Sequence, residues 1–318
     1  MLAAILCLSS VSCRKRKKSN NQNTPPPLSQ PSPIPSADIP KTVPNISFGG
    51  HCPLGPDTTE ASTRILPSDA LVTWNESFKL PVQVLKKGLI PGSYSNARNY
   101  RLSFDVGGTS PSSAVTDQSG MALLSLQAYE QTTNPICVSI RGDVSTSVGR
   151  VFVSNPKDSL VVVLIDDVFE NTTAKAFSEK KSVGVTANSL AVKAIDELAS
   201  KYRIVYISLL EESMGPVLKR WIKSNSLPPG PVYLWDDSYG SIQSSALGAD
   251  FTFVSAVTRK LKSKFTRVFA GISTQTRVGN AFVAAGIDGY FVSSGTSTVS
   301  GLQAKRLMSW SDASLIKP

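Results

Sequence analysis

Histidine is nearly missing from this sequence, in which one residue of 318, His51, is a histidine. The chain after His51 therefore holds no Ser-His-Asp triad, no Cys-His dyad, no HExxH zinc helix and no cage of histidine metal ligands. Catalysis by an imidazole group is excluded for that part of the chain.

Long hydrophobic runs are missing as well. No stretch approaches about 18 uninterrupted apolar residues, the length of a membrane-spanning helix, which excludes a multispan membrane protein. Hydrophobic residues still make up 41% of the chain, enough to bury folded cores, so a wholly disordered chain is also excluded. The length allows two domains of ordinary size.

Basic residues outnumber acidic ones, and the net charge is +10. Five of the 33 basic residues form one run, Arg14–Lys18, and the remaining chain is only mildly basic. We therefore expect no nucleic-acid partner.

The N-terminal residues have the pattern of an export signal. Residues 2–12 are apolar or small, too few to span a bilayer, and end directly before Cys13. With Ser12 in front of this cysteine, the segment 1–13 resembles a bacterial lipoprotein signal. The resemblance implies lipid attachment at Cys13, a membrane partner through that anchor, and a place in the bacterial cell envelope on its periplasmic or surface face. An ordinary N-terminal segment is the alternative.

The segment after the signal is rich in proline. Ten of the 21 prolines lie before residue 59, among Ser, Asn and Gln, so residues 14–67 are expected to form an extended tether without a core. Two cysteines remain beyond the signal, Cys52 and Cys137. In an exported protein they form either a disulfide that ties the tether to the first domain, or two unpaired small hydrophobic residues.

Short runs of period two fill residues 68–155. They are separated by Gly, Pro, Asn and Ser at roughly ten-residue spacing, which predicts an antiparallel all-β sandwich. The runs are 77–85, 100–106, 121–129, 136–142 and 149–154. The TDxxGxA segment from Thr116 to Ala122 resembles a hairpin of bacterial immunoglobulin-like (Ig-like) and transthyretin-like modules. This resemblance implies an Ig-like fold and no particular function. Because residues 68–155 hold no clustered acids for calcium and no row of exposed aromatic residues for sugar, we expect a spacer or a docking platform for the next domain.

Residues 156–318 alternate between apolar runs and amphipathic helices. The runs are 159–165, 204–208, 231–235, 267–272 and 290–294, and the helices are 189–202, about 213–224, one through 265 and one through 285. This alternation predicts an α/β fold, a doubly wound parallel sheet, with the informative residues just after the strands.

Three stretches of this region carry a resemblance. VVVLIDDVFENT, RIVYISLLEESMGPVLKRWIKSNSLPPGPVYLW and RVFAGISTQTRVGNAFVAAGIDGYFV are similar to the lipin-type phosphatidate-phosphatase branch of the haloacid dehalogenase (HAD) superfamily. The resemblance covers about residues 150–295, and WIxxxxLPPGPVYL is its most specific part. It implies a HAD-like fold, two catalytic aspartates in a DxDxT motif, a serine and a lysine that hold the phosphoryl group, and magnesium.

The first motif of this family is degenerate here. One register places Ile165 at the nucleophile and Asp167 at the general acid, and a shift by one places Asp166 at the nucleophile and Val168 at the acid. Neither register keeps both aspartates. Because side chains alternate along a strand, we expect either Asp166 or Asp167, but not both, to point into the cleft.

The other motifs are only partly kept. Ser208 stands at the serine of the family, but Val254 replaces the lysine and Val278 replaces the acid of the metal loop. Lys260 lies further along the same helix as Val254. Asp166 and Asp167 are therefore candidate catalytic remnants, and Ser208 and Lys260 are candidate ligand contacts.

These replacements favour a catalytically degenerate pseudo-phosphatase with a binding or scaffolding role, without a metal site or cofactor. Its lipid or protein ligand is not specified by the sequence. Two alternatives stay open. One is an active magnesium-dependent phosphatase that acts on phosphatidate or another phosphate ester through Asp166 or Asp167, and the other is a surface adhesin or assembly factor.

Overall fold

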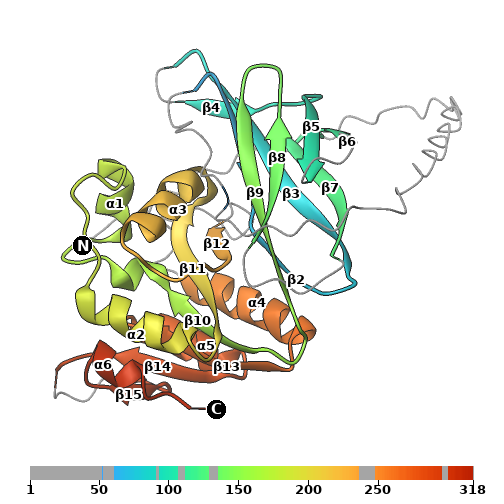
Figure 1. Ribbon diagram of the computed structural model, residues 1–318. Helices are drawn as coiled ribbons and strands as arrows, with labels where there is room; N and C mark the ends of the chain where they lie inside the picture. The colour runs from blue at the N-terminus through green and yellow to red at the C-terminus, as the bar shows by residue number, and fades with distance from the viewer. Residues whose placement is uncertain are drawn as a thin grey trace, which may run out of the picture. The chain divides into compact units, whose positions relative to one another are not determined.

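The computed structural model describes residues 52, 61–90, 93–106, 112–128, 135–235, 248–295 and 300–317. All of them belong to one compact unit, Pro44–Pro318, in which a β-rich part precedes a part of alternating strands and helices (Figure 1). Cys13 and the expected lipoprotein signal lie outside the described residues. The helices in the described ranges are all too short or too polar to cross a membrane.

The β-rich part consists of two sheets that share one hydrophobic core. The first sheet contains, in order, β1 (Thr63–Pro67), β3 (Ser77–Lys87) and β4 (Tyr94–Asn96), with β7 (Met121–Gln127) also paired to β3. The second has the order β2 (Ala70–Thr73), β9 (Thr146–Ser154), β8 (Ile136–Arg141), β5 (Arg101–Val106) and β6 (Ser112–Val115). Val82 and Leu124 of the first sheet and Leu102 and Ile140 of the second are fully buried in the same cluster.

Period-two patterning explains these strands. In β3, Leu80, Val82 and Val84 are fully buried, while the residues between them face outward. The five expected runs coincide with β3, β5, β7, β8 and β9. Neighbouring strands run antiparallel as expected, with one exception, the parallel pair β2–β9.

Two expectations about this part need correction. The folded part begins before residue 68, because β1 lies within the range 14–67 and its Ile65 is fully buried. The TDxxGxA segment is a turn between the two sheets rather than a hairpin, because β6 pairs with β5 and β7 pairs with β3. Asp117 still organises the turn by accepting hydrogen bonds from Ser119 N and Met121 N, and Gly120 has a φ of 75°.

A disulfide bond joins Cys52 to Cys137 in β8, with their Cα atoms 5.4 Å apart. Cys52 is 5% exposed. The bond closes a chain segment with a sequence separation of 85 residues, so it restrains the unfolded chain as well as the folded one.

The second part contains a six-stranded sheet in which all neighbours run parallel. Its order is β12 (Val232–Trp235), β11 (Arg203–Glu211), β10 (Ser159–Leu164), β13 (Arg267–Ser273), β14 (Asp288–Val292) and β15 (Lys305–Leu307). The helices are α1 (Ala174–Lys180), α2 (Ser189–Ala199), α3 (Gly215–Ser224), α4 (Ala249–Lys264), α5 (Thr276–Ala284) and α6 (Trp310–Ala313). The five expected strands are thus present, and β15, α1 and α6 are additions to the expected series.

Helices cover both faces of this sheet. Val161 and Val163 of β10 pack in the cluster that contains the buried side chains of α2 and α3, whereas Leu160, Val162 and Leu164 pack in the cluster with those of α4 and α5. A strand buried on both faces has no polar side to present, which explains its continuous apolar run.

Two local features fix the helices to the sheet. Asn188 caps α2 by accepting hydrogen bonds from Leu190 N and Ala191 N. In β13, Gly271 lies under the ring of Phe282 of α5, where a Cβ atom would come 2.2 Å from the ring. Only a glycine leaves room for this close packing of helix on strand.

Candidate functional site

The aspartate pair lies directly after the central strand. β10 ends at Leu164, and Asp166 and Asp167 belong to a short 3-10 helix, η1 (Ile165–Val168). Strand alternation, on which the expectation of one inward aspartate rested, therefore does not apply to these residues. The hydrogen bonds of each carboxylate decide where it points.

Asp166 turns toward β11. It is 6% exposed, and its carboxylate accepts hydrogen bonds from Ser208 Oγ at 2.5 Å and from Leu209 N at 2.6 Å. Burial raises the pKa of Asp166 to about 7, although the two hydrogen bonds by themselves lower it. The negative charge of Asp167 adds to the rise. Asp166 is thus a carboxyl group that changes its charge near neutral pH.

Asp167 turns toward β13, on the other side of β10. Its half-buried carboxylate accepts hydrogen bonds from Ser273 Oγ at 2.6 Å, Thr274 N at 2.6 Å and Gln275 Nε2 at 3.0 Å. Burial raises the pKa of Asp167, and these hydrogen bonds oppose the rise. The two carboxylates therefore connect the end of β10 to β11 on one side and to the end of β13 on the other.

The family's magnesium does not fit this arrangement. A shared cation needs carboxylate oxygens that converge and are free to bind it, whereas here each carboxylate is held by hydroxyl or amide donors of a different strand. Val254 and Val278, at the expected lysine and metal-loop positions, are fully buried in the apolar cluster under α4 and α5.

Of the expected ligand contacts, Ser208 lies with the aspartates and Lys260 does not. Ser208 is fully buried and donates to Asp166, while its Oγ accepts from Leu210 N at 3.1 Å. Lys260 is an exposed residue of α4 that lines a separate cavity. Neither Asp166 nor Asp167 is among the residues that line this cavity.

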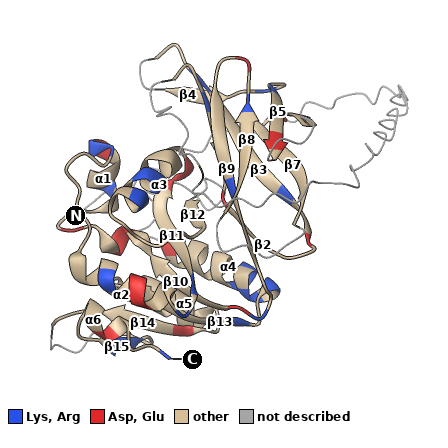
Figure 2. Ribbon diagram, viewed as in Figure 1, with Lys and Arg blue, Asp and Glu red and all other residues tan. Residues whose placement is uncertain are grey.

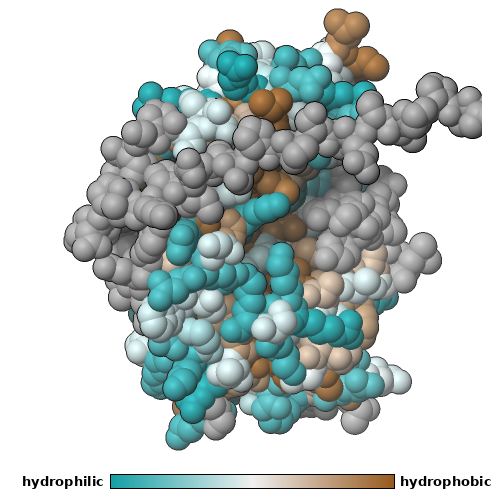
Figure 3. Space-filling model, turned by 90° about the vertical axis from the view of Figure 1, so that its right-hand side faces the viewer, coloured by the Kyte–Doolittle hydropathy of each residue, from teal (hydrophilic) through white to brown (hydrophobic). Residues whose placement is uncertain are grey.

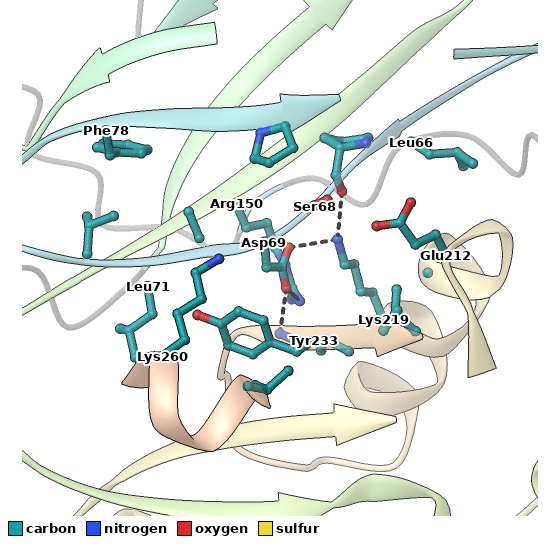
Figure 4. A pocket seen from close by; sticks show the side chains of 18 of the residues that line it. Leu66, Ser68, Asp69, Leu71, Phe78, Arg150, Glu212, Lys219, Tyr233 and Lys260 are labelled. Carbon is teal, nitrogen blue, oxygen red and sulfur yellow. Dashed lines mark hydrogen bonds and ion pairs between the residues drawn. The ribbon is translucent and has the colours of Figure 1, made fainter. Parts of the chain in front are cut away.

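This junction cavity, of about 280 Å³, lies where the β-rich part meets α3, β12 and α4 (Figure 4). Its apolar lining includes Leu71, Phe78 and Val257. Its charged lining residues are Lys79, Arg150, Lys219, Lys260, Lys264, Asp69 and Glu212.

A buried ion network forms one side of the junction cavity. Asp69 Oδ1 is 2.7 Å from Lys219 Nζ and accepts from Arg150 Nε at 3.1 Å, while Oδ2 accepts from Arg150 Nη2 and from Val232 N at 2.9 Å. Lys219 Nζ also donates to Pro67 O at 3.4 Å. We call Asp69, Arg150 and Lys219 the Asp69 network. Because these three side chains come from both folded parts, the network joins them.

The electrostatics of the network keep its carboxylate charged. Burial alone would raise the pKa of Asp69, but the charges and hydrogen bonds of Arg150 and Lys219 outweigh it, and the pKa is lowered. Burial lowers the pKa of Lys219, and Asp69 and Glu212 oppose this.

Sequence reasoning missed the Asp69 network because its members lie far apart in the chain. The available signal was a charged residue inside a run of buried ones: Arg150 stands between Gly149 and Val151 in β9, and Lys219 follows Val217 and Leu218 in α3. Charges in such positions are rarely buried unless they are paired. Nothing in the pattern identifies the partner, so the network is visible only in the fold.

The comparisons with known proteins identify no family. No family model and no curated protein matches the sequence. A solved structure described as an IG27 protein domain has 11% identity and a TM-score of 0.21 over 29% of this chain and 96% of that one. The structure of a carbohydrate acetylesterase from Xanthomonas citri has 10% sequence identity and a TM-score of 0.30. The match covers 79% of this chain and 72% of the esterase chain. Likenesses this weak support no inference about fold or activity.

Proposed function

We propose that the chain is a non-catalytic, HAD-like binding or scaffolding protein held at the bacterial cell envelope by a lipid anchor. One observation carries the non-catalytic part. Asp166 and Asp167, the only aspartates at the first motif, are hydrogen-bonded to opposite neighbouring strands. Carboxylates held in this way stabilise the carboxyl end of the sheet, and they are not placed to act on one phosphoryl group as nucleophile and general acid.

The strand order supports the HAD-like, doubly wound part of the proposal. Counted along the chain, the six parallel strands stand in the order 3-2-1-4-5-6. This is a strand order of doubly wound α/β sheets, in which ligands bind beyond the carboxyl ends of the strands. Asp166 and Asp167 follow the first strand of that order, as the nucleophile and general acid of the family would.

The end of β10 also suggests how the motif was lost. In the family, the first strand ends in DxDxT, and here the strand ends at Leu164. The register that keeps Asp167 at the general acid places Ile165, directly after the strand, at the nucleophile. The nucleophile position is then held by a fully buried isoleucine, which cannot form an aspartyl phosphate.

The disulfide supports export. Disulfide bonds persist in the periplasm and at cell surfaces and are rare in the cytosol. The Cys52–Cys137 bond therefore agrees with a lipoprotein signal ending at Cys13. Replacing Cys13 with Ala should abolish labelling of the expressed protein by radioactive palmitate, and unchanged labelling would contradict the anchor.

A phosphatase assay tests the central point. We expect no magnesium-dependent turnover of phosphatidate or p-nitrophenyl phosphate above that of the Asp166→Asn and Asp167→Asn variants. A rate of ~1 s⁻¹, within the usual enzyme range, that is lost in either variant would overturn the proposal in favour of an active phosphatase. Circular dichroism spectra of both variants control for misfolding.

A further inference from the structure

The junction cavity has the dimensions and position of a small-ligand site. Its volume of about 280 Å³ lies just below the range of roughly 300–1,000 Å³ for drug-sized ligands. It lies between two folded parts, which is a preferred location for ligand pockets. A ligand that fits must therefore be small.

The charges of the cavity favour an anion. Of its seven charged lining residues, five are basic and two are acidic. Asp69 and Glu212 balance the buried Arg150 and Lys219, to which they are electrostatically coupled. The excess positive charge therefore lies on the lysines nearer to solvent.

Two of these lysines are available to a ligand. Lys264 forms an ion pair with Glu76. Among the described residues, the side chains of Lys79 in β3 and Lys260 in α4 have no hydrogen-bond or ion-pair partner, and both are exposed. Both line the cavity, one from each folded part. Lys260 points into the space (Figure 4). Figure 2 shows further basic residues along the same end of α4.

Much of the remaining lining is apolar. Leu71, Phe78 and Val257 present hydrocarbon surface, and the hydroxyl of Tyr233 is hydrogen-bonded to the backbone of Leu71. The space-filling view shows a hollow with hydrophobic side chains in its depth and hydrophilic side chains at its edge (Figure 3). A cavity of this kind suits a molecule with one charged end and one apolar end.

We propose that the junction cavity binds a small organic anion, in which a carboxylate, phosphonate or phosphate group is carried on a short apolar body. Lys260 and Lys79 hold the charged group at the mouth, and the apolar body lies against Leu71, Phe78 and Val257. The Asp69 network fixes the separation of the two walls. The site is distinct from the aspartate pair after β10, so this inference does not depend on whether the aspartates are catalytic.

Phenylphosphonate is a suitable probe because a phosphatase cannot hydrolyse its carbon–phosphorus bond. We expect saturable binding to the full chain in calorimetry, with a Kd below ~1 mM. Lys260→Gln, which removes a charge-assisted contact, should weaken binding by roughly tenfold, and Lys79→Gln should act in the same direction. Because both lysines are exposed, the variants should keep their thermal midpoints.

Matched controls separate this site from general charge attraction. Lys175→Gln removes an 87% exposed lysine of α1 outside the cavity and should leave the Kd unchanged. Benzyl alcohol, without charge, and inorganic phosphate, without an apolar body, should both bind at least about tenfold more weakly, because each lacks one of the two recognised features. No saturable binding of phenylphosphonate, equal binding of inorganic phosphate, or an equal loss in Lys175→Gln would each overturn the proposal.

Discussion

Lys219 Nζ of α3 lies 2.7 Å from Oδ1 of Asp69, in the turn between β1 and β2, and both side chains are buried. This ion pair crosses from the α/β part to the β-rich part, and Arg150 of β9 completes it. A buried pair of this kind depends on each of its partners, because the loss of one leaves the other charged without compensation.

Removing the carboxylate of Asp69 should therefore destabilise the fold strongly. We expect Asp69→Asn to lower the free energy of unfolding by about 3–5 kcal/mol, because Arg150 and Lys219 are left buried without their anion. Urea unfolding at pH 7 measures the effect. Lys305→Ala, which breaks the exposed pair with Asp288, is the matched control and should cost far less, because water screens an exposed pair. A loss below about 1 kcal/mol for Asp69→Asn would show that the network does not hold the two parts together.

The raised pKa of Asp166 makes stability depend on pH. Its folded-state pKa is about 7 and its ordinary value is 3.8, so the folded protein binds the proton more tightly than the unfolded chain does. The resulting stabilisation is complete below about pH 4 and is lost as the pH rises through 7. The free energy of unfolding should therefore fall across this window.

Asp166→Asn should make that fall shallower, because the amide stays neutral while its oxygen can still accept from Leu209 N. Urea midpoints measured between about pH 4 and pH 8 test this, with the exposed Asp143→Asn as the control. The same slope in Asp166→Asn and the parent protein would contradict the assignment. The raised pKa of Asp167 also makes the free energy of unfolding fall as the pH rises, so some dependence of stability on pH should remain in Asp166→Asn.

Reduction of the disulfide should lower stability by about 3–5 kcal/mol, because the Cys52–Cys137 bond closes a loop with a separation of 85 residues. Thermal unfolding with and without dithiothreitol measures this. In Cys137→Ser the midpoint should already be low and should not respond to the reductant. An unchanged midpoint of the parent protein on reduction would show that the bond contributes little.

A methyl group at Gly271 should disturb the packing of α5 on the sheet. The added Cβ would overlap the ring of Phe282, so we expect Gly271→Ala to cost about 1–3 kcal/mol. In a Phe282→Leu background the same change should cost clearly less, since the ring is gone. Additive effects of the two substitutions in urea unfolding would argue that these residues do not clash.

Local patterns predicted most of the strands and helices. The run 77–85 alternates between apolar and polar residues, because one face of its strand is buried. The run 159–165 is continuously apolar, because both faces of its strand are buried. The patterns failed where partners are distant in sequence. Thr63–Pro67 falls within the predicted tether because the alternating pattern of the β-rich part becomes clear only after it, and its pairing with β3 makes it a strand. The TDxxGxA turn has the residues of a hairpin, but which strands it separates depends on the pairing of whole sheets.

The site was predictable in its position and not in its geometry. The sequence placed Asp166, Asp167 and Ser208 at strand ends, and Ser208 and Asp166 do form a hydrogen bond. The sequence could not show that Asp167 accepts a hydrogen bond from Ser273 rather than from Ser208. The 3-10 turn after Leu164 breaks the strand alternation on which the prediction rested. Lys260 was proposed for the same site, yet it lies on the half of α4 that faces the junction cavity.

The disulfide also decides how mechanical tension would travel through the protein. A pull on the segment before Cys52 enters β8 directly at Cys137, then passes through β9 and the turn at 155–158 into β10. Strands β1 to β7 lie outside this covalent path while the bond is intact. In the oxidised chain the load would thus bypass β1 to β7, and reduction would route it through the whole β-rich part, starting at β1.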